Sequence, residues 1–323
     1  MKKIYVVIPN WNGADLVAEC LESLKKQSQK HEVIVVDNGS IDNSVSVIQG
    51  QFPEVNLVCL PKNTGFSGGV NTGLIHAMDQ GADAVALFNN DAVAEKDWLK
   101  KLSETMEKVP RAGIVTGKLF RNNRKHLDST GENYSIWGMP FPRDRNNKDE
   151  GRHDEKEEVF AASGGASIYR VEMLKEIGLF DQKFFAYYED VDISFRAQLG
   201  GWKVVYQPSA VAYHHVSATS SKLGDFTRYH ATKNFLMLYA KNMPGWLYWK
   251  YLPLFTVQAA RLCASSILRG GGVAYFKGVF RAILNTPHII RERRRIQKTR
   301  KVSIGYIDSM LYKQRPPRIP KIS

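Results

Sequence analysis

Short apolar runs that end in polar residues recur through the first ninety residues, and they constrain the fold more than any other feature of this sequence. The first run, IYVVI, begins at Ile4 and stops at Pro9, which cannot continue a β-ladder. A helix is predicted from Asp15 to Lys26, and the run EVIVV then leads to Asp37. Because a strand, a helix and a second strand in this order pair in parallel, the sequence predicts an α/β fold with a mostly parallel central sheet and flanking helices.

Polar residues follow these two strands at the points where each strand ends. In open parallel sheets, ligands bind at the carboxyl ends of the strands, so Pro9, Asn10 and Asp37 are candidate ligand-binding residues. A carboxylate such as Asp37 accepts hydrogen bonds from a nucleobase N–H or a ribose hydroxyl. A turn followed by a helix cap before Ser44 is the alternative explanation of the same residues.

A glycine-rich segment follows the third apolar run, VNLVCLP, which ends at Pro61. Backbone without Cβ atoms can approach a diphosphate closely, and a helix beginning near Gly69 would point free N–H groups at the anion. The spacing matches neither the dinucleotide-binding GxGxxG nor the P-loop motif. A flexible turn is the alternative. The residues of this segment that are candidates for binding a diphosphate ligand are Asn63, Gly65, Gly69 and Asn71.

A further strand, Ala84 to Phe88, ends in the amides and the acid of FNNDA. An oxygen ligand at a strand end suits Mg²⁺ or Mn²⁺, which takes one or two protein carboxylates and completes its shell with phosphate oxygens and water. Such a cation would neutralise the charge that develops on a diphosphate leaving group. Asp91 is therefore the metal candidate, with Asn89 and Asn90 on the donor side; a helix cap is the alternative role of Asp91.

Taken together, these motifs resemble glycosyltransferase family 2. The resemblance rests on IPNWNG, VVDNGS, NTGFSGGVNTG, FNNDA, SGGASIYR and EDVDIS, and it covers about residues 4 to 216. The branch that it most resembles is the rhamnosyltransferase-like one, through GFSGG and the segment FAYYEDVDISFRAQLGGWKVVYQPSAVAYHH. It implies a GT-A fold, a nucleoside-diphosphate sugar donor, a divalent cation and inversion at the anomeric carbon.

The resemblance also implies residue roles. The usual metal motif of the family is Asp-x-Asp, of which this chain keeps the last acid, Asp91; a histidine after the late strand, His214, matches a second metal ligand. Asp190 matches the base that accepts the proton of the acceptor hydroxyl, and acids in a first helical turn are its structural alternative. The acceptor-side candidates are Gly164, Gly165, Glu189 and Trp202, the last of which either stacks on a sugar or packs in the core.

The positive charge is concentrated in the C-terminal part of the chain. Residues 228–323 contain 19 Lys and Arg against 2 acids, a charge of +17 in a chain of +13 overall. They form a predicted basic, amphipathic helical extension after a catalytic domain at 1–227, whose nucleotide-sugar half is 1–118 and whose acceptor half is 119–227. No apolar run reaches the about 18 residues of a spanning helix, so interfacial helices at an anionic inner leaflet are expected. A helical hairpin packed on the catalytic domain, or a homodimer contact, is the alternative, and nucleic acid is not an expected partner.

The segment from Arg121 to Glu158 is polar and rich in turns, which predicts a loop excursion with an acidic tip near Asp149. The three cysteines lie in apolar segments and the N-terminus lacks the pattern of a signal peptide, which favours a cytoplasmic protein at the inner membrane face.

The predicted function is inverting transfer of a sugar, with rhamnose from dTDP-rhamnose as the candidate, to a lipid-linked glycan in cell-surface polysaccharide synthesis. A non-catalytic GT-A-like assembly protein and a nicotinamide-dependent Rossmann enzyme are the rival hypotheses. The latter would need its glycine fingerprint after the first strand, where this chain has PNWNG.

Overall fold

The computed structural model describes residues 1, 3–215 and 224–319. Its elements are β1 (Ile4–Asn10), α1 (Ala14–Lys25), β2 (Glu32–Asp37), α2 (Ser44–Gln51), β3 (Asn56–Cys59), α3 (Gly65–Asp79), β4 (Ala84–Phe88), β5 (Ala92–Ala94), α4 (Trp98–Lys108), β6 (Ala112–Arg121), β7 (Leu127–Ser129), β8 (Glu132–Tyr134), β9 (Pro140–Pro142), β10 (Glu157–Glu158), β11 (Ala166–Arg170), α5 (Val171–Ile177), α6 (Glu189–Leu199), β12 (Lys203–His214), α7 (Gly224–Asn242), α8 (Gly245–Leu268), α9 (Gly272–Leu284), α10 (Thr286–Lys298) and α11 (Ile304–Met310).

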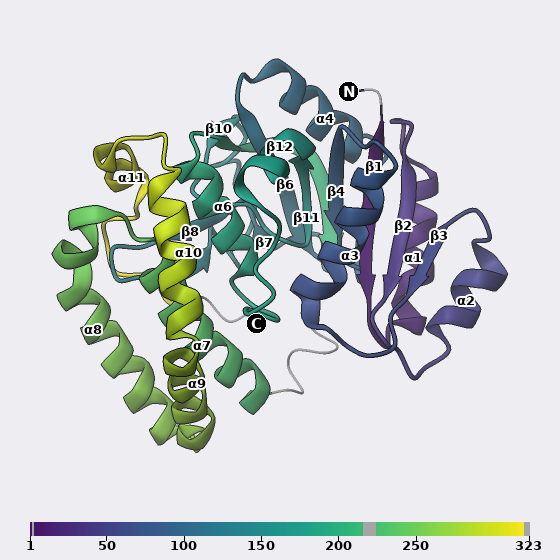
Figure 1. Cartoon of the computed structure of the whole chain (residues 1–323). Helices are drawn as coiled ribbons and strands as arrows, with labels where there is room; N and C mark the ends of the chain where they lie inside the picture. The colour runs from purple at the N-terminus through teal and green to yellow at the C-terminus, as the bar shows by residue number, and fades with distance from the viewer. Residues whose placement is uncertain (2, 216–223, 320–323) are drawn as a thin grey trace.

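A central sheet with the strand order β10-β12-β6-β11-β4-β1-β2-β3 carries the fold (Figure 1). The neighbours β3, β2, β1 and β4 are parallel, as are β6 and β12, whereas β11 lies antiparallel between β4 and β6. The predicted mostly parallel α/β sheet, including the strand at Ala84–Phe88, is therefore confirmed.

Both faces of the sheet are covered, which explains why the strands are apolar almost throughout. In β1, Ile4, Val6 and Ile8 belong to the core beneath α1 and α4, whereas Tyr5 and Val7 belong to the core beneath α3, α5 and α6. Successive side chains of a strand point to opposite faces, so a strand buried on both sides needs apolar residues at every position.

The glycine-rich helix α3 packs closely on the sheet. A Cβ atom at Gly73 would lie 2.3 Å from a Val7 side-chain carbon, so this glycine sets the distance between helix and strand. The helix begins at Gly65 rather than near Gly69, which corrects the prediction. Asn38 and Asn63 are the reason: their side-chain oxygens accept hydrogen bonds from the backbone N–H groups of Thr64 and Gly65, which satisfies these donors at the helix start.

The segment from residue 121 to 158 is folded, contrary to the predicted loop excursion. It contains the short strands β7, β8, β9 and β10, and β7 pairs with β6 while β10 pairs with β12. The acidic tip is also held in place, because the buried Lys118 ammonium contacts Asp149 at 2.8 Å and Asp154 at 2.6 Å. Lys118 of β6 thus orders the acidic part of the segment. The pattern of apolar runs gave no sign of this contact.

The C-terminal helices form a third hydrophobic core with α6 and β8 rather than a detached tail. Among the described residues, no helix is long and apolar enough to cross a membrane. α8 contains Pro253 in its interior. Cys20 is buried as predicted, but Cys59 is exposed. The division of the chain at residue 227 stays a prediction.

A buried ionic network joins α6 to α7. The two carboxylate oxygens of Asp192 bind the Arg196 guanidinium at 2.9 Å and the Lys241 ammonium at 2.7 Å, and Asn242 donates a further bond of 2.7 Å. All four side chains are buried. Asp192, the last acid of the EDVD motif, is therefore a structural residue that anchors the helical extension to the catalytic part.

We predict that Asp192→Ala lowers the free energy of unfolding by about 3–5 kcal/mol, because Lys241 and Arg196 would keep buried charges without this partner. Urea unfolding followed by circular dichroism measures the change. Asp225→Ala, which removes the exposed partner of Arg228, is the matched control and should leave the unfolding midpoint unchanged. Equal effects of the two substitutions would contradict the role of the network.

Candidate active site

A cavity of about 500 Å³ opens at the carboxyl ends of β1, β2 and β4. Twelve of the residues predicted from the sequence line it: Pro9, Asn10, Asn63, Gly65, Asn89, Asn90, Asp91, Gly164, Gly165, Glu189, Asp190 and His214. They come from strand ends, from the start of α3, from the loop before β11 and from the first turn of α6. Parallel pairing brings these distant segments together because all the strands concerned end at the same edge.

Asp37 does not line the cavity, and its direct contact with a ligand stays a prediction. Its buried carboxylate accepts hydrogen bonds from the Asn10 side chain at 3.0 Å and from the Ser40 backbone at 3.0 Å. The Asn10 oxygen in turn accepts a bond of 2.7 Å from Asn90. The strand register places Asn10 opposite Asp37, so the carboxylate is held behind Asn10 and orients it.

Three further predicted residues lie outside the cavity lining. Asn71 is buried and exchanges two hydrogen bonds with the backbone of Phe180, because α3 begins four residues early and turns this side chain towards the segment between α5 and α6. Gly69 packs beneath Asn38, whose side-chain nitrogen would lie 3.2 Å from an added Cβ. Trp202 is a core residue, with the Arg111 guanidinium 3.8 Å from its ring centroid.

The start of α3 is also less open to an anion than predicted. The N–H groups of Thr64 and Gly65 donate to Asn38 and Asn63, and that of Ser67 donates to the Phe185 carbonyl. The N–H groups of Thr64, Gly65 and Ser67 are therefore satisfied within the protein. Binding of a diphosphate at this helix start stays a prediction.

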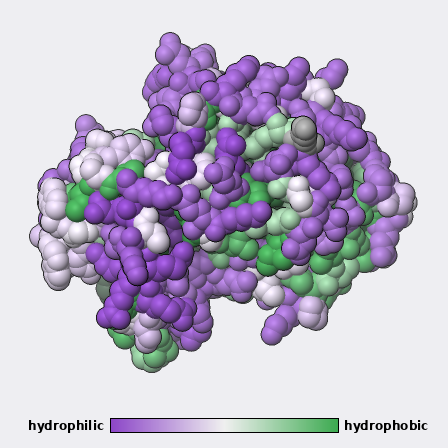
Figure 2. All heavy atoms as spheres, turned by 45° about the horizontal axis from the view of Figure 1, so that its top comes forward, coloured by the Kyte–Doolittle hydropathy of each residue, from purple (hydrophilic) through white to green (hydrophobic). Residues whose placement is uncertain are grey.

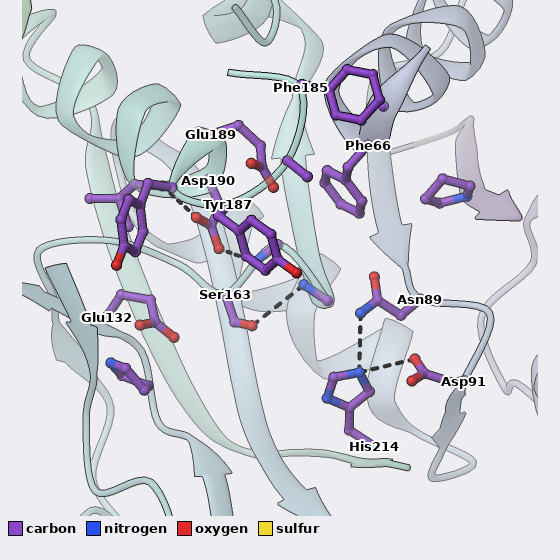
Figure 3. Close-up of a pocket in the computed structure, with 18 of the residues that line it drawn as sticks. Phe66, Asn89, Asp91, Glu132, Ser163, Phe185, Tyr187, Glu189, Asp190 and His214 are labelled. Atoms are coloured by element: carbon purple, nitrogen blue, oxygen red, sulfur yellow. Dashed lines mark hydrogen bonds and ion pairs between the residues drawn. The ribbon is translucent and has the colours of Figure 1, made fainter. Parts of the chain in front are cut away.

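His214 links two carboxylates at one side of the cavity (Figure 3). Its Nε2 atom lies 3.0 Å from Asp91 and 3.2 Å from the Asn89 amide, and its Nδ1 atom lies 2.9 Å from the buried Asp128. The two carboxylates raise the pKa of His214 to about 9 although burial opposes this shift. Asp128 holds the ring so that Nε2 and Asp91 face the cavity together.

A second acidic group lies on the other side of the Ser163–Gly165 loop, as Figure 3 shows. Asp190 accepts hydrogen bonds from the backbone N–H groups of Gly164 at 2.9 Å and Val191 at 2.8 Å, and these bonds favour its charged form. Glu189 and Glu132 are buried nearby. Burial, and then the neighbouring Asp190 charge, raises the pKa of Glu132 to about 8 and also raises that of Glu189.

The glycines of the SGG motif allow the backbone to approach both groups. An added Cβ at Gly164 would lie 3.2 Å from Asp190, and one at Gly165 would lie 3.1 Å from the Asn89 amide. The loop therefore passes between the Asp190 carboxylate and the Asn89 amide with no room for side chains. This close approach is what the two glycines provide here.

Sequence reasoning missed an aromatic wall that covers the cavity. Phe185, Tyr187 and Tyr188 line it in the left-handed backbone region, with φ values of 65°, 73° and 68°. Non-glycine residues are strained there and need support. Asn234 of α7 supplies that support, because its side-chain nitrogen donates to the carbonyls of Phe184, Ala186 and Tyr187 at 3.0, 2.8 and 2.6 Å.

Asp128, Glu132 and Arg145 were also missed, since they lie in the segment that was predicted to be a loop. No motif marked them. Asp128 and Glu132 are buried, and Arg145 binds Asp128 at 3.0 Å, contacts that only the tertiary structure reveals.

The comparisons with known proteins agree with this architecture. Residues 5–178 match the family described as glycosyl transferase family 2. The chain is 26% identical over 210 residues, 59% of this chain and 68% of the relative, to an N-acetylglucosaminyl-diphospho-decaprenol L-rhamnosyltransferase of Mycobacterium tuberculosis. It is 25% identical over 247 residues, 74% of this chain and 80% of the relative, to the dTDP-rhamnosyl transferase RfbF of Shigella flexneri.

Solved structures support the GT-A fold. The mannosyltransferase PcManGT from Pyrobaculum calidifontis, in complex with GDP-Man and Mn²⁺, superposes with a TM-score of 0.54 at 17% identity, over 88% of this chain and 86% of that one. TarS residues 1–349 of S. aureus gives 0.53 at 19% identity, over 79% and 70%. At these identities the likeness concerns the fold alone.

We predict that Glu132→Gln stabilises the protein at high pH. Folding raises the pKa of the Glu132 carboxyl group from 4.5 to about 8. The contribution of this group to the free energy of unfolding is therefore fully present below pH 4.5 and is lost as the pH rises through 8. The amide keeps the shape without ionising, so the Tm of the variant should match that of the parent at pH 4 and exceed it by several degrees at pH 9. Thermal unfolding at both pH values measures this, with the exposed Glu172→Gln as control. The same difference in Tm at both pH values would contradict the shifted pKa.

Proposed function

Because the chain belongs to glycosyl transferase family 2, we propose that it transfers a sugar, with rhamnose from dTDP-rhamnose as the candidate, from a nucleoside diphosphate to a hydroxyl of a lipid-linked glycan with inversion. One observation carries the proposal: a single cavity holds the Asp91–His214 pair on one side and the backbone-held Asp190 carboxylate on the other. The nicotinamide hypothesis finds no support, because the glycine-rich segment follows β3 and not β1.

Asp190 would act as the general base that accepts the proton of the acceptor hydroxyl. Burial raises the pKa of all three acids here, to about 8 for Glu132 and Glu189, but Asp190 accepts hydrogen bonds from two backbone N–H groups that oppose this shift and favour its charged form. The ionised acid is the one that can remove a proton. Protonated Glu132 and Glu189 would instead donate hydrogen bonds to acceptor hydroxyls.

A divalent cation would lie between Asp91 and His214. Among the described residues, no group of three or more His, Cys, Asp or Glu side chains gathers as a metal site. The residues nevertheless fit a cation, since the Asp91 carboxylate and His214 Nε2 face the cavity 3.0 Å apart, and Mg²⁺ or Mn²⁺ takes its remaining ligands from substrate phosphates and water. When bound, the cation supplies charge neutralisation to the diphosphate leaving group.

The protein's own residues would then position the donor. Asn10 and Asn90 are held by the buried Asp37 and present fixed amide groups next to Asp91. Asn63 lines the cavity at the start of α3, where it accepts a hydrogen bond from the Gly65 N–H. Asp128 fixes the ring orientation of His214 so that Nε2 faces Asp91. The raised pKa of His214 keeps the Nε2 proton on the ring in the absence of a cation, and His214 would lose this proton on binding one. These residues would bind and orient the donor, and the aromatic wall of Phe185, Tyr187 and Tyr188 would shield the reacting atoms from water.

We predict that Asp190→Asn lowers kcat at least about 100-fold, as loss of a general base commonly does, with little change in the affinity for the donor. Release of nucleoside diphosphate from dTDP-rhamnose, measured with a panel of lipid-linked acceptors, gives kcat. Glu189→Gln is the matched control: the group is already protonated, so its kcat should stay within about tenfold of the parent. A kcat for Asp190→Asn within the same range would disprove the base assignment.

We also predict that Mn²⁺ strengthens the binding of one nucleoside diphosphate, and that Asp91→Asn removes this enhancement. Calorimetric titration with thymidine, uridine and guanosine diphosphates, each with and without Mn²⁺, measures it. The control is Asp97→Asn, which changes an acid that contacts Ser28 far from the cavity and should keep the enhancement. If folded protein binds no diphosphate, the non-catalytic hypothesis is favoured.

A further inference from the structure

The helix α9 presents an apolar face to solvent. Each residue of this face is more than half exposed: Val273, Phe276, Phe280, Ile283 and Leu284. The opposite face, with Ala274, Tyr275, Gly278 and Ala282, is buried. A surface helix of a globular domain normally turns its one apolar stripe to the core and a polar face to water. α9 has an apolar stripe on both sides, and the outer one has no partner among the described residues.

The adjoining end of α8 extends the same surface. Ile267 is 54% exposed and Leu268 is 86% exposed, and Gly270 and Gly271 connect them to α9. Figure 1 shows the α8–α9 connection at the lower left, at the end of the molecule, and Figure 2 shows apolar side chains gathered at that end. We call Ile267, Leu268, Val273, Phe276, Phe280, Ile283 and Leu284 the α8–α9 surface. Contiguous exposed apolar surface of this kind marks an interaction site.

All charges within α8, α9 and their connection are positive, and Asp225 at the start of α7 is paired with Arg228, which packs on Gly271. No Asp or Glu occurs from residue 226 to residue 291, whereas Arg269, Lys277 and Arg281 are exposed beside the apolar side chains. In a twofold dimer the same patch faces itself, so these cations would lie against their own copies. Anionic lipid headgroups complement them instead, and an apolar stripe flanked by Lys and Arg is the pattern of a helix that lies in a membrane interface.

The α8–α9 surface is joined to the wall of the cavity only through the buried face of α9. Gly278 of α9 packs on α7, where an added Cβ would lie 2.7 Å from the Tyr229 carbonyl and 2.9 Å from Thr232. One turn earlier in α7, Phe226 lines the cavity beside Phe185. The exposed face of α9 therefore points away from α7, and α9 lies between this face and the cavity wall.

From the exposed apolar face and the positive charge of α8 and α9, we propose that the α8–α9 surface docks this chain onto an anionic lipid bilayer. Phe276, Phe280 and Leu268 enter the headgroup region, and Lys277, Arg281 and Arg269 contact lipid phosphates. No helix of the described residues spans a membrane, so α8 and α9 lie along the interface. The proposal concerns a surface outside the cavity and does not depend on the proposed chemistry.

Co-sedimentation of the full chain with vesicles tests this. We expect the protein to bind vesicles of phosphatidylcholine mixed with phosphatidylglycerol at least about tenfold more strongly than vesicles of phosphatidylcholine alone. The double variant Phe276→Ser/Phe280→Ser should lower binding at least about tenfold, because two large apolar side chains leave the interface. Lys277→Gln/Arg281→Gln should reduce binding to the anionic vesicles and leave the weak binding to phosphatidylcholine as it is.

The matched control is Ile41→Ser/Ile75→Ser, which removes two other exposed apolar side chains, 94% and 49% exposed, from outside the surface; it should bind like the parent. All four substituted phenylalanine and isoleucine sites are exposed, and circular dichroism verifies that each variant is folded.

Absence of vesicle binding by the parent, or binding unchanged in the phenylalanine variant, would overturn the proposal. A dimer in sedimentation velocity that the phenylalanine variant abolishes would also overturn it and assign the surface to a second copy. Lost transfer with intact vesicle binding would count against the proposed function alone.

Discussion

Parallel pairing of β1 with β2 and β4 is the constraint on which the rest of the structure depends. The register sets Asn10 beside Asp37 and Val7 beside Leu87, so the polar residues that follow these strands meet at one edge of the sheet. Hydrogen bonds then pass from Asp37 through Asn10 to Asn90. A shift of the register by one residue would turn every side chain of β1 to the other face and separate these groups.

The acidic side of the cavity depends on the C-terminal helices. Asn234 of α7 holds the left-handed segment before α6, Lys233 donates to the carbonyls of Lys183 and Phe184, and Asp192 fixes α6 to α7. The first turn of α6, which carries Asp190, therefore keeps its position only while α7 is packed against it. The helical extension contributes to the geometry of the site as well as to the charge of the protein.

Three carboxyl groups of similar chemistry have different environments within this site. Asp190 accepts hydrogen bonds from two backbone N–H groups, and Glu132 accepts one from the Ser129 hydroxyl. Glu189 has one carboxylate oxygen without a hydrogen-bond partner among the described residues. Burial disfavours the charged form of all three, and the backbone donors oppose this for Asp190. Local hydrogen bonding rather than residue type thus distinguishes the three carboxyl groups.

The order of apolar runs and polar ends by itself determined the sheet, the edge at which ligands bind and most of the cavity residues, because strand periodicity and the rule for strand ends are local properties. Tertiary structure decided the rest. Register set Asp37 behind Asn10, the early start of α3 turned Asn71 towards Phe180, and Trp202 packs in the core beneath α5 and α6. Asp128, Glu132 and the aromatic wall entered the site from segments without periodicity, through contacts between residues far apart in the sequence that no local pattern records.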